Sequence, residues 1–168
     1  MRKIKKKFQK PRSRWDSERI KKENESMKTY GLTKKQEVWK VESILRSFRR
    51  RARGLAAKRD KVQEKVLIDK LHKMGLLEKD ASVDAVLSLT SEKLLERRLQ
   101  TFVFKKNLAN TIRHSRQLIT HGHIAVDGRK IVYPSFIVTR GLEDKISFYK
   151  SPKLKAPIKT VETTKAGE

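Results

Sequence analysis

Cationic and amide side chains recur at helical spacing in the segment 111–121, where they could bind phosphate groups. Arg113, Arg116 and Gln117 stand at positions i, i+3 and i+4, so they share one face of a helix. Guanidinium groups form charge-assisted, often bidentate hydrogen bonds with phosphate oxygens. Hydroxyl and imidazole groups flank this face at Thr111, His114, His121 and His123. The pattern predicts a surface that contacts the backbone of a nucleic acid.

A denser group of arginines falls within the segment 34–57. Arg46, Arg50 and Arg53 are spaced i, i+4 and i+7, with Arg49 and Arg51 alongside. Like charges at i, i+4 destabilise an isolated helix by about 0.2–0.5 kcal/mol per pair, and a purely structural helix would alternate its charges. We therefore interpret this cluster as a phosphate clamp. The alternative is a solvated charged face.

A third polar cluster surrounds a loop that is predicted between two helices, at 107–110. Its basic members are Arg97, Arg98, Lys105 and Lys106. Asn107, Asn110 and Thr111 follow in the loop and at the start of the next helix. Backbone N–H groups at a helix N-terminus, joined by amide and hydroxyl side chains, suit a phosphate. Asn110 or Thr111 also fits as the cap of that helix, and capping is compatible with phosphate contact.

The four histidines raise the question of metal binding or catalysis. They are His72, His114, His121 and His123. His121 and His123 are separated by one glycine, and no third ligand has suitable spacing. The sequence has no cysteine, which excludes disulfides and thiolate metal sites, and it shows no nucleophile motif or phosphate-binding glycine loop. We expect no enzyme, no metal and no cofactor, and RNA contact or local packing for the histidines.

Composition points to a polyanionic partner. The 168 residues contain 43 Lys and Arg against 19 Asp and Glu, a formal net charge of +24. Such an excess repels itself in a compact fold unless a polyanion neutralises it. No stretch approaches the roughly 18 apolar residues of a spanning helix, and no apolar signal segment follows the basic start. Nucleic acid, rather than a membrane, is the expected partner.

Apolar periodicity predicts the helices that position these residues. In chain order they span 16–27, 34–57, 60–74, 82–87 and 92–106. The clearest, 34–57, has a continuous stripe of Val38, Val41, Leu45, Phe48, Ala52 and Leu55. Trp15 is a possible anchor for the first helix. Asp60 is the expected cap of the third, and Thr90 or Ser91 that of the last.

The helix at 111–121 is expected to end at Gly122 and to lead directly into a tight hairpin. Asp127-Gly128 lies between Ile124 and Ile131, and a type I′ turn requires positive φ at both central residues. Two further strands are predicted at 136–139 and 145–148. Pro134 suits the loop before the third strand, because proline cannot donate to a central ladder. Arg129 and Lys130 follow the turn and extend the basic surface.

Both ends of the chain are basic and poor in apolar residues. The segment 1–14 contains eight basic residues, which are Arg2, Lys3, Lys5, Lys6, Lys7, Lys10, Arg12 and Arg14. Such a segment cannot bury enough surface to offset its ordering entropy. We expect an arm that becomes ordered along phosphates, with a solvated tail as the alternative. Residues 150–168 are expected to form an extended basic tail.

These motifs resemble the RNA-binding module named after small-subunit ribosomal protein four. The resemblance rests on Ser115-Arg116-Gln117-Leu118-Ile119, His121-Gly122-His123-Ile124 and Val126-Asp127-Gly128-Arg129. The strings at 94–101 and 29–32 resemble the archaeal or eukaryotic branch of this ribosomal family, so the resemblance covers roughly 29–148. Bacterial members often carry a cysteine zinc cluster, which a chain without cysteine cannot form.

The resemblance implies an α+β fold. An N-terminal helical domain would precede a compact RNA-binding module of two helices packed on a small, mostly antiparallel β-sheet, with extended basic tails at both ends. The expected parts are a basic arm and short helix at 1–28, a helical scaffold with the arginine-rich helix at 29–93, the module at 94–149 and the tail at 150–168.

The resemblance also implies a function. It implies a structural constituent of the small subunit of the cytoplasmic ribosome that binds small-subunit ribosomal RNA and nucleates assembly of its 5′ domain. It further implies support of translational accuracy through contact with small-subunit protein five, and neither a membrane nor a small-molecule substrate. With few aromatic residues and no stacking platform, recognition is expected to rest on phosphates, 2′-hydroxyls and RNA shape.

Two other functions are compatible with the module. The first is a ribosome-assembly factor of the small-subunit processome, which has a similar architecture but leaves the mature subunit. The second is an RNA-modifying enzyme such as a pseudouridine synthase. That enzyme would need a catalytic domain beyond the module, whereas only about twenty residues follow Phe148.

Overall fold

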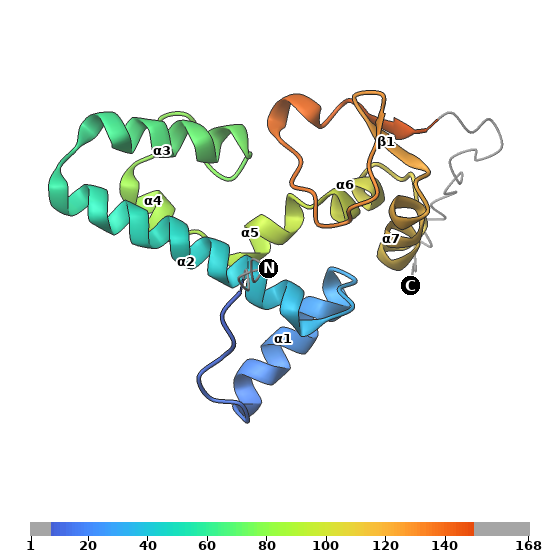
Figure 1. Cartoon of the computed structure of the whole chain (residues 1–168), viewed down its shortest axis with the longest axis horizontal. Coiled ribbons are helices and arrows are strands. Elements are labelled where there is room, and N and C mark those ends of the chain that lie inside the picture. The colour runs from blue at the N-terminus through green and yellow to red at the C-terminus, as the bar shows by residue number, and fades with distance from the viewer. Residues whose placement is uncertain (1–7, 150–168) are drawn as a thin grey trace, which may run out of the picture.

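The computed structural model describes residues 8–149, which form an α+β structure (Figure 1). Residues 1–7 of the expected basic arm, with Arg2, Lys3, Lys5, Lys6 and Lys7, and the expected tail at 150–168 lie outside the described residues. The first part of the chain is helical, with α1 Ser17–Thr29, α2 Lys35–Lys58, α3 Lys61–Lys73, α4 Val83–Leu87 and α5 Ser91–Glu96. The second part comprises α6 Leu99–Lys105, α7 Ile112–Thr120, β1 Ile124–Val126, β2 Arg129–Lys130, the 3₁₀ helix η1 Arg140–Leu142 and β3 Ile146–Phe148.

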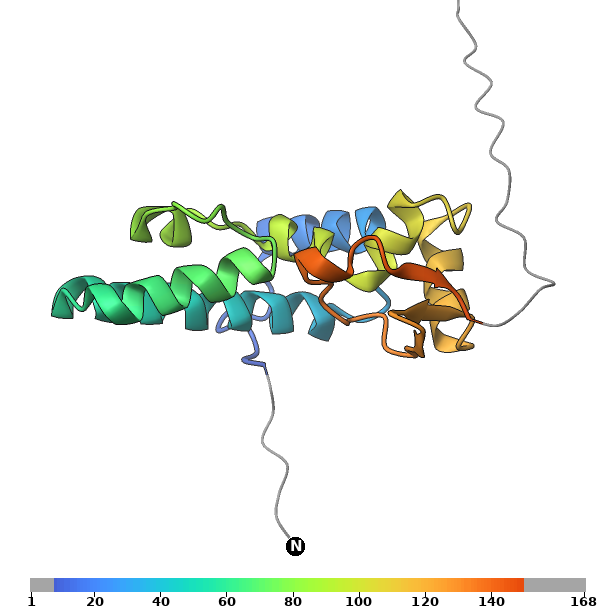
Figure 2. The ribbon, with the colours of Figure 1, turned by 90° about the horizontal axis from the view of Figure 1, so that it is seen from above.

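Helix α2 is the longest element and the backbone of the helical part. The side chains of the predicted stripe are buried from Val38 to Ala52, and Leu55 is half-buried at the cluster's edge. They pack against α3, α4 and α5, as periodicity of 3.6 residues requires. Figures 1 and 2 show α2 running from the module to the far end of the molecule, where α3 turns back beside it.

The helix ends largely follow the predicted signals. The carboxylate of Asp60 accepts a hydrogen bond of 3.2 Å from the backbone N–H of Gln63 and so caps α3, as predicted. Asp16 caps α1 in the same way. The prediction that Trp15 anchors this helix was wrong, because its side chain is 90% exposed.

The helix predicted at 92–106 is two helices. Helix α5 ends at Glu96, α6 begins at Leu99, and Arg98 between them has an extended backbone with φ −75° and ψ 143°. The backbone on either side of Arg98 forms hydrogen bonds with the segment 136–138 instead of continuing the helix. The Leu99 N–H donates to the Phe136 carbonyl at 2.7 Å, and the Val138 N–H donates to the Arg97 carbonyl at 2.9 Å.

The same pairing corrects the strand predicted at 136–139. Ile137 forms an isolated antiparallel bridge with Arg98, and the segment joins no sheet. Pro134 accordingly lies in a turn rather than before a strand. Both errors have one cause, because the segment that was expected to extend the sheet instead pairs with the point where the helix breaks.

The sheet has three antiparallel strands in the order β2-β1-β3. The predicted hairpin turn is confirmed, with positive φ at Asp127 (53°) and Gly128 (74°) joining β1 to β2. The longer connection before β3 contains η1. Strand β1 is buried along its whole length, with β2 and β3 on either side.

Two apolar clusters form the interior of the described chain. The first extends through the helical part and ends at Leu94 and Leu95, while the second begins at Leu99 and includes Ile119, Ile124 and Val138. The change from one to the other falls at the break between α5 and α6. The two parts therefore meet at Arg97 and Arg98, and the polar contacts there set their relative orientation.

Candidate nucleic-acid interface

One side of α2, next to the start of α5, carries a hollow lined mainly by arginines. Arg46, Arg49, Arg50 and Arg53 line a space of about 660 Å³ together with Glu42, Leu45 and Ser91. The four arginines stand at i, i+3, i+4 and i+7, so one helical face presents them together. Arg46, Arg50 and Arg53 are exposed and form no ion pair among residues 8–149. We call this surface the α2 arginine face.

The other two arginines of the predicted cluster have different surroundings. Arg49 is half-buried, and its guanidinium donates to the carbonyl of Leu89. The guanidinium carbon of Arg51 lies 6.0 Å from the centre of the Phe48 ring, and Arg51 lines a groove between α2 and α3. The structure therefore brings together four of the five arginines and separates Arg51 from them.

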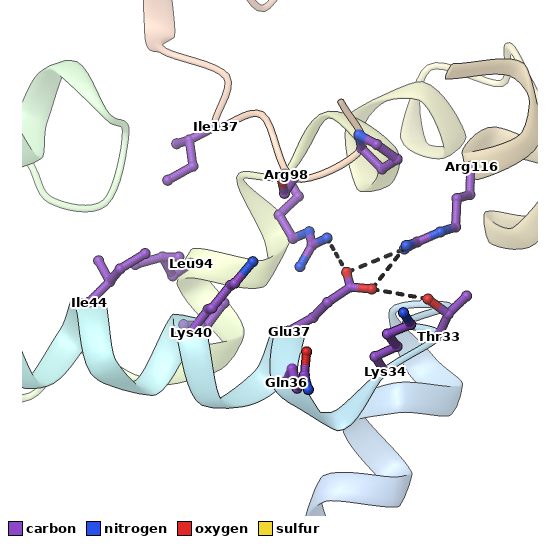
Figure 3. A pocket seen from close by; sticks show the side chains of 13 residues that line it. Thr33, Lys34, Gln36, Glu37, Lys40, Ile44, Leu94, Arg98, Arg116 and Ile137 are labelled. Carbon is purple, nitrogen blue, oxygen red and sulfur yellow. Dashed lines mark hydrogen bonds and ion pairs between the residues drawn. The ribbon is translucent and has the colours of Figure 1, made fainter. Parts of the chain in front are cut away.

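A carboxylate at the start of α2 joins the two parts of the chain (Figure 3). The Arg98 Nη2 donates to Oε2 of Glu37 at 2.5 Å. Arg116 binds Glu37 with both terminal nitrogens, Nη2 to Oε1 at 2.9 Å and Nη1 to Oε2 at 3.2 Å. The hydroxyl of Thr33 donates to Glu37 Oε1 at 3.1 Å. Glu37, Arg98 and Arg116 thus connect α2 with both helices of the module, and we call them the junction cluster.

The junction cluster is desolvated and charged. The side chain of Arg98 is only 5% exposed and that of Glu37 15%. Burial raises the pKa of Glu37, but hydrogen bonds and positive charges from Arg116 and Arg98 outweigh it and hold the pKa at about 2. Burial also lowers the pKa of Arg98, partly offset by the charge of Glu37. Glu37 is therefore ionised at neutral pH and holds both arginines in place.

Gln100 and Arg97 reinforce the junction. The Gln100 amide donates to the carbonyls of Gly31 at 3.0 Å and Ile112 at 3.1 Å, linking the end of α1 to the start of α7. Arg97 pairs with Glu143 at 2.5 Å and donates to the Val138 carbonyl at 2.8 Å. Arg97, Arg98 and Arg116 thus each have an intramolecular carboxylate partner. Their predicted role as RNA contacts stays a prediction.

Sequence reasoning did not single out Glu37. A glutamate in the first turn of a helix normally complements the helix dipole, so its position carried no signal of its own. Its partners lie 61 and 79 residues away. The only signal in the sequence was the presence of arginines beside predicted apolar positions. An arginine that is buried there requires an acceptor such as a carboxylate.

The module presents a second polar surface around the start of α7. Thr111 caps this helix by accepting a hydrogen bond of 3.1 Å from the His114 N–H, and Asn107 has positive φ in the preceding loop. Asn110, Arg113 and Gln117 are exposed. Lys105 pairs with Glu96 at 3.4 Å and Lys106 with Asp144 at 3.8 Å, both near the surface. We call the loop and the exposed side of α7 the α7 face.

The hairpin end of α7 adds further cations and the paired histidines. The rings of His121 and His123 stack with centroids 6.2 Å apart. Arg129 and Lys130 are exposed on β2. Gly122 has φ +76°, and a Cβ there would meet the Lys130 side chain, so glycine fits both the backbone and the close approach. Among residues 8–149, no group of three or more potential metal ligands comes together.

Comparison of the sequence with protein families and with known proteins agrees with this architecture. Residues 97–144 match the family model of the S4 domain. The chain is 46% identical over 164 residues to small ribosomal subunit protein uS4 of Methanothermobacter thermautotrophicus, covering 96% of each chain. It is 49% identical over 158 residues to the protein of the same name from Sulfolobus acidocaldarius, covering 92% of this chain and 90% of the other. It is 47% identical over 170 residues to the protein of the same name from Saccharolobus solfataricus, covering 99% of this chain and 94% of the other.

Fold and surface together define an RNA-binding protein built on an S4 domain. The chain belongs to the family of small ribosomal subunit protein uS4, in its archaeal form, which confirms the resemblance. It is thus a structural protein of the small subunit of the cytoplasmic ribosome and not an enzyme. Between residues 8 and 149, no helix combines the length and apolar character needed to cross a bilayer.

Proposed function

We propose that this protein binds small-subunit ribosomal RNA through two cationic surfaces held at a fixed relative orientation. The first is the α2 arginine face, and the second is the α7 face with the hairpin cations Arg129 and Lys130. The proposal rests on the α2 arginine face, where Arg46, Arg50 and Arg53 form no ion pair among residues 8–149. The single carboxylate lining this hollow, that of Glu42, interacts electrostatically with Arg46 and leaves most of the positive charge unbalanced. Such an excess of clustered cations favours external anions.

The two surfaces have different chemistry. Guanidinium groups on α2 suit phosphate oxygens, which position a protein on RNA without reading its sequence. The amide and hydroxyl groups of Asn107, Asn110 and Thr111 suit phosphates and 2′-hydroxyls near the start of a helix. Two such surfaces at fixed orientation match the shape of a folded RNA junction, rather than a sequence motif.

Salt dependence of binding tests this proposal. The RNA is a transcribed fragment containing the 5′ domain of small-subunit ribosomal RNA from the same organism. Each phosphate contact contributes about −0.9 to the slope of log K against log salt for a duplex, and we expect a slope steeper than about −4. A triple variant with Arg46, Arg50 and Arg53 changed to Gln should flatten that slope by about 2–3.

Arg51→Gln is the matched control, since this arginine lies on the same helix but outside the α2 arginine face. It should change the slope by less than about 1, the contribution of one contact. Equal effects of the triple variant and the control would contradict the assignment of the α2 face. An unchanged slope in the triple variant would contradict it directly.

We further propose that this protein nucleates assembly of the 5′ domain and supports translational accuracy by contacting small-subunit protein five. Support comes from the strong positive charge, which favours early association with bare RNA, and from membership of the uS4 family. In reconstitution, omitting the protein should prevent later proteins from joining the 5′ domain. A cross-link to small-subunit protein five in intact subunits should be detectable, and its absence would contradict the contact.

Retention in the mature subunit separates this proposal from the assembly-factor alternative. The identity of 46–49% extends over nearly the whole chain and is to proteins named as ribosomal components. We expect one copy in each purified, translating small subunit, measured by quantitative mass spectrometry. Presence only in precursor particles would favour the assembly factor.

A further inference from the structure

A groove lined partly by apolar side chains lies between α2 and α3. The connection between these two helices is at the end of the molecule farthest from the sheet (Figures 1 and 2). The groove encloses about 560 Å³. Its apolar lining residues are Leu55, Val66 and Leu67, and its charged lining residues are Arg51, Lys58 and Lys70. This groove is separate from both the α2 arginine face and the α7 face.

On the α3 side, one lining residue of the groove is an exposed valine. Val66 is 63% exposed, and Val62, one turn earlier on the same helix, is 74% exposed. On the α2 side, a Cβ added at Gly54 would meet no atom within 4 Å, so the space beside the helix is open. Aliphatic side chains gain free energy when another apolar surface covers them, and phosphate groups do not provide such a surface.

The charges around the groove specify the partner. The charged residues that line it are Arg51, Lys58 and Lys70, without any carboxylate. The opposite side of α3 is different, because a second hollow there mixes lysines with Glu64, Asp69, Asp80 and Asp84. The groove is therefore complementary to a surface that combines apolar side chains with carboxylates, and such complementarity selects partners.

We propose that this groove binds a neighbouring small-subunit protein through a segment with apolar side chains flanked by Asp or Glu. The proposal rests on the function proposed above, because it requires the chain to be part of the subunit. Apolar contact with Val66, Leu55 and Leu67 anchors the segment. Arg51, Lys58 and Lys70 pair with its carboxylates at the rim, where protein interfaces are usually polar.

A photo-cross-linking amino acid at position 66 of the full chain tests the proposal in purified small subunits. We expect a cross-link to one ribosomal protein, at a peptide in which Asp or Glu neighbours apolar residues. The same amino acid at position 65, on the opposite side of α3, is the matched control and should not yield that product. A cross-link from position 66 to RNA or to a second copy of this chain, or no cross-link at all, would overturn the proposal.

Cosedimentation keeps the two proposals distinguishable. A chain that is absent from small subunits would overturn the proposed function and the groove inference together. A chain that is present but shows no protein cross-link at position 66 would overturn the groove inference alone.

Charge reversal supplies a second measurement. Lys70→Glu with Lys58→Glu should reduce the cross-link yield from position 66 by about tenfold, because like charges across an interface disfavour binding. Lys65→Glu is the control for charge, and its yield should stay within about twofold. An equal yield in all three proteins would overturn the acidic character assigned to the partner.

Discussion

The arginines of the junction cluster and those of the α2 arginine face have the same side chain but opposite surroundings. Arg98 and Arg116 face the carboxylate of Glu37 and are buried or half-buried. Arg50 and Arg53 are exposed and have no ion-pair partner in the part of the chain that the structure describes. Spacing along a helix is therefore insufficient to assign an arginine to RNA. The fold gives Arg98 and Arg116 an internal carboxylate partner, whereas Arg50 and Arg53 have no such ion pair among residues 8–149.

The two groups also contribute to function differently. In the proposed function, the α2 arginine face attracts RNA by its charge, and salt should weaken that attraction because the groups are solvated. The junction cluster fixes the angle between the helical part and the module, since Glu37 bonds to residues on both sides of the boundary. A buried ion pair adds little net stability compared with an apolar contact. Removing one partner, however, leaves the other charge buried without a counter-charge, which destabilises the fold.

Removing Glu37 should have the largest effect on stability. Glu37→Ala leaves Arg98 buried without its carboxylate, which should lower the free energy of unfolding by about 3–5 kcal/mol. Glu42→Ala is the matched control on the same helix, since Glu42 forms no ion pair among residues 8–149 and its pKa is raised by burial and by Glu23. Denaturant unfolding measures both. If both variants lost a similar amount of unfolding free energy, the Glu37 ion pairs would not stabilise the fold more than an unpaired glutamate does, and the contrast between the two arginine groups would fail.

The ionisation of Glu37 predicts a pH-dependent contribution to stability. Its pKa is about 2 in the fold against 4.5 ordinarily, so the contribution is complete above pH 4.5 and disappears as pH falls toward 2. Such a shift corresponds to about 3 kcal/mol. The difference in unfolding free energy between the wild type and Glu37→Gln should therefore shrink across this interval. A difference that stays constant as the pH is lowered through this interval would contradict the assigned ionisation.

The same conservative substitution should act differently in the two groups. Arg116→Lys replaces a bidentate contact with a single ammonium, and should lower the unfolding free energy by about 1–2 kcal/mol. Arg50→Lys keeps a point charge for phosphate and should change stability by less than about 0.5 kcal/mol. Thermal or denaturant unfolding, done without RNA, separates the two. A stable Arg116→Lys variant would show that the bidentate geometry is unimportant.

Local signals along the chain account for most of the fold. Asp127-Gly128, Gly122 and Asp60 lie where turn and cap chemistry places them, because these preferences depend on neighbouring residues. The break at Arg97-Arg98 could not be predicted in this way. It depends on backbone hydrogen bonds to Phe136 and Val138, which compete with helix continuation from some forty residues away.

The candidate site shows the same division between local and distant causes. The α2 arginine face followed from helical spacing alone, since its arginines form no ion pair among residues 8–149 that would draw them to another part of the fold. The junction cluster did not, because Glu37 and Arg116 are brought together only by the fold. The position of Arg51 was also missed, since its contact with Phe48 and the groove depends on where α3 packs.

Removing an exposed ion pair should have the smallest effect on stability. It tests whether the junction cluster stabilises the fold because it is buried or merely because its charges are paired. Lys145 and Asp127 lie 3.0 Å apart, but both side chains are more than half exposed. Asp127→Asn removes the charge while retaining a side chain that tolerates the positive φ of 53°. The unfolding free energy should change by less than about 0.5 kcal/mol, because exposed pairs are solvated in both states. A loss comparable to that of Glu37→Ala would mean that pairing alone stabilises this fold, and that solvent exposure does not separate its two kinds of arginine.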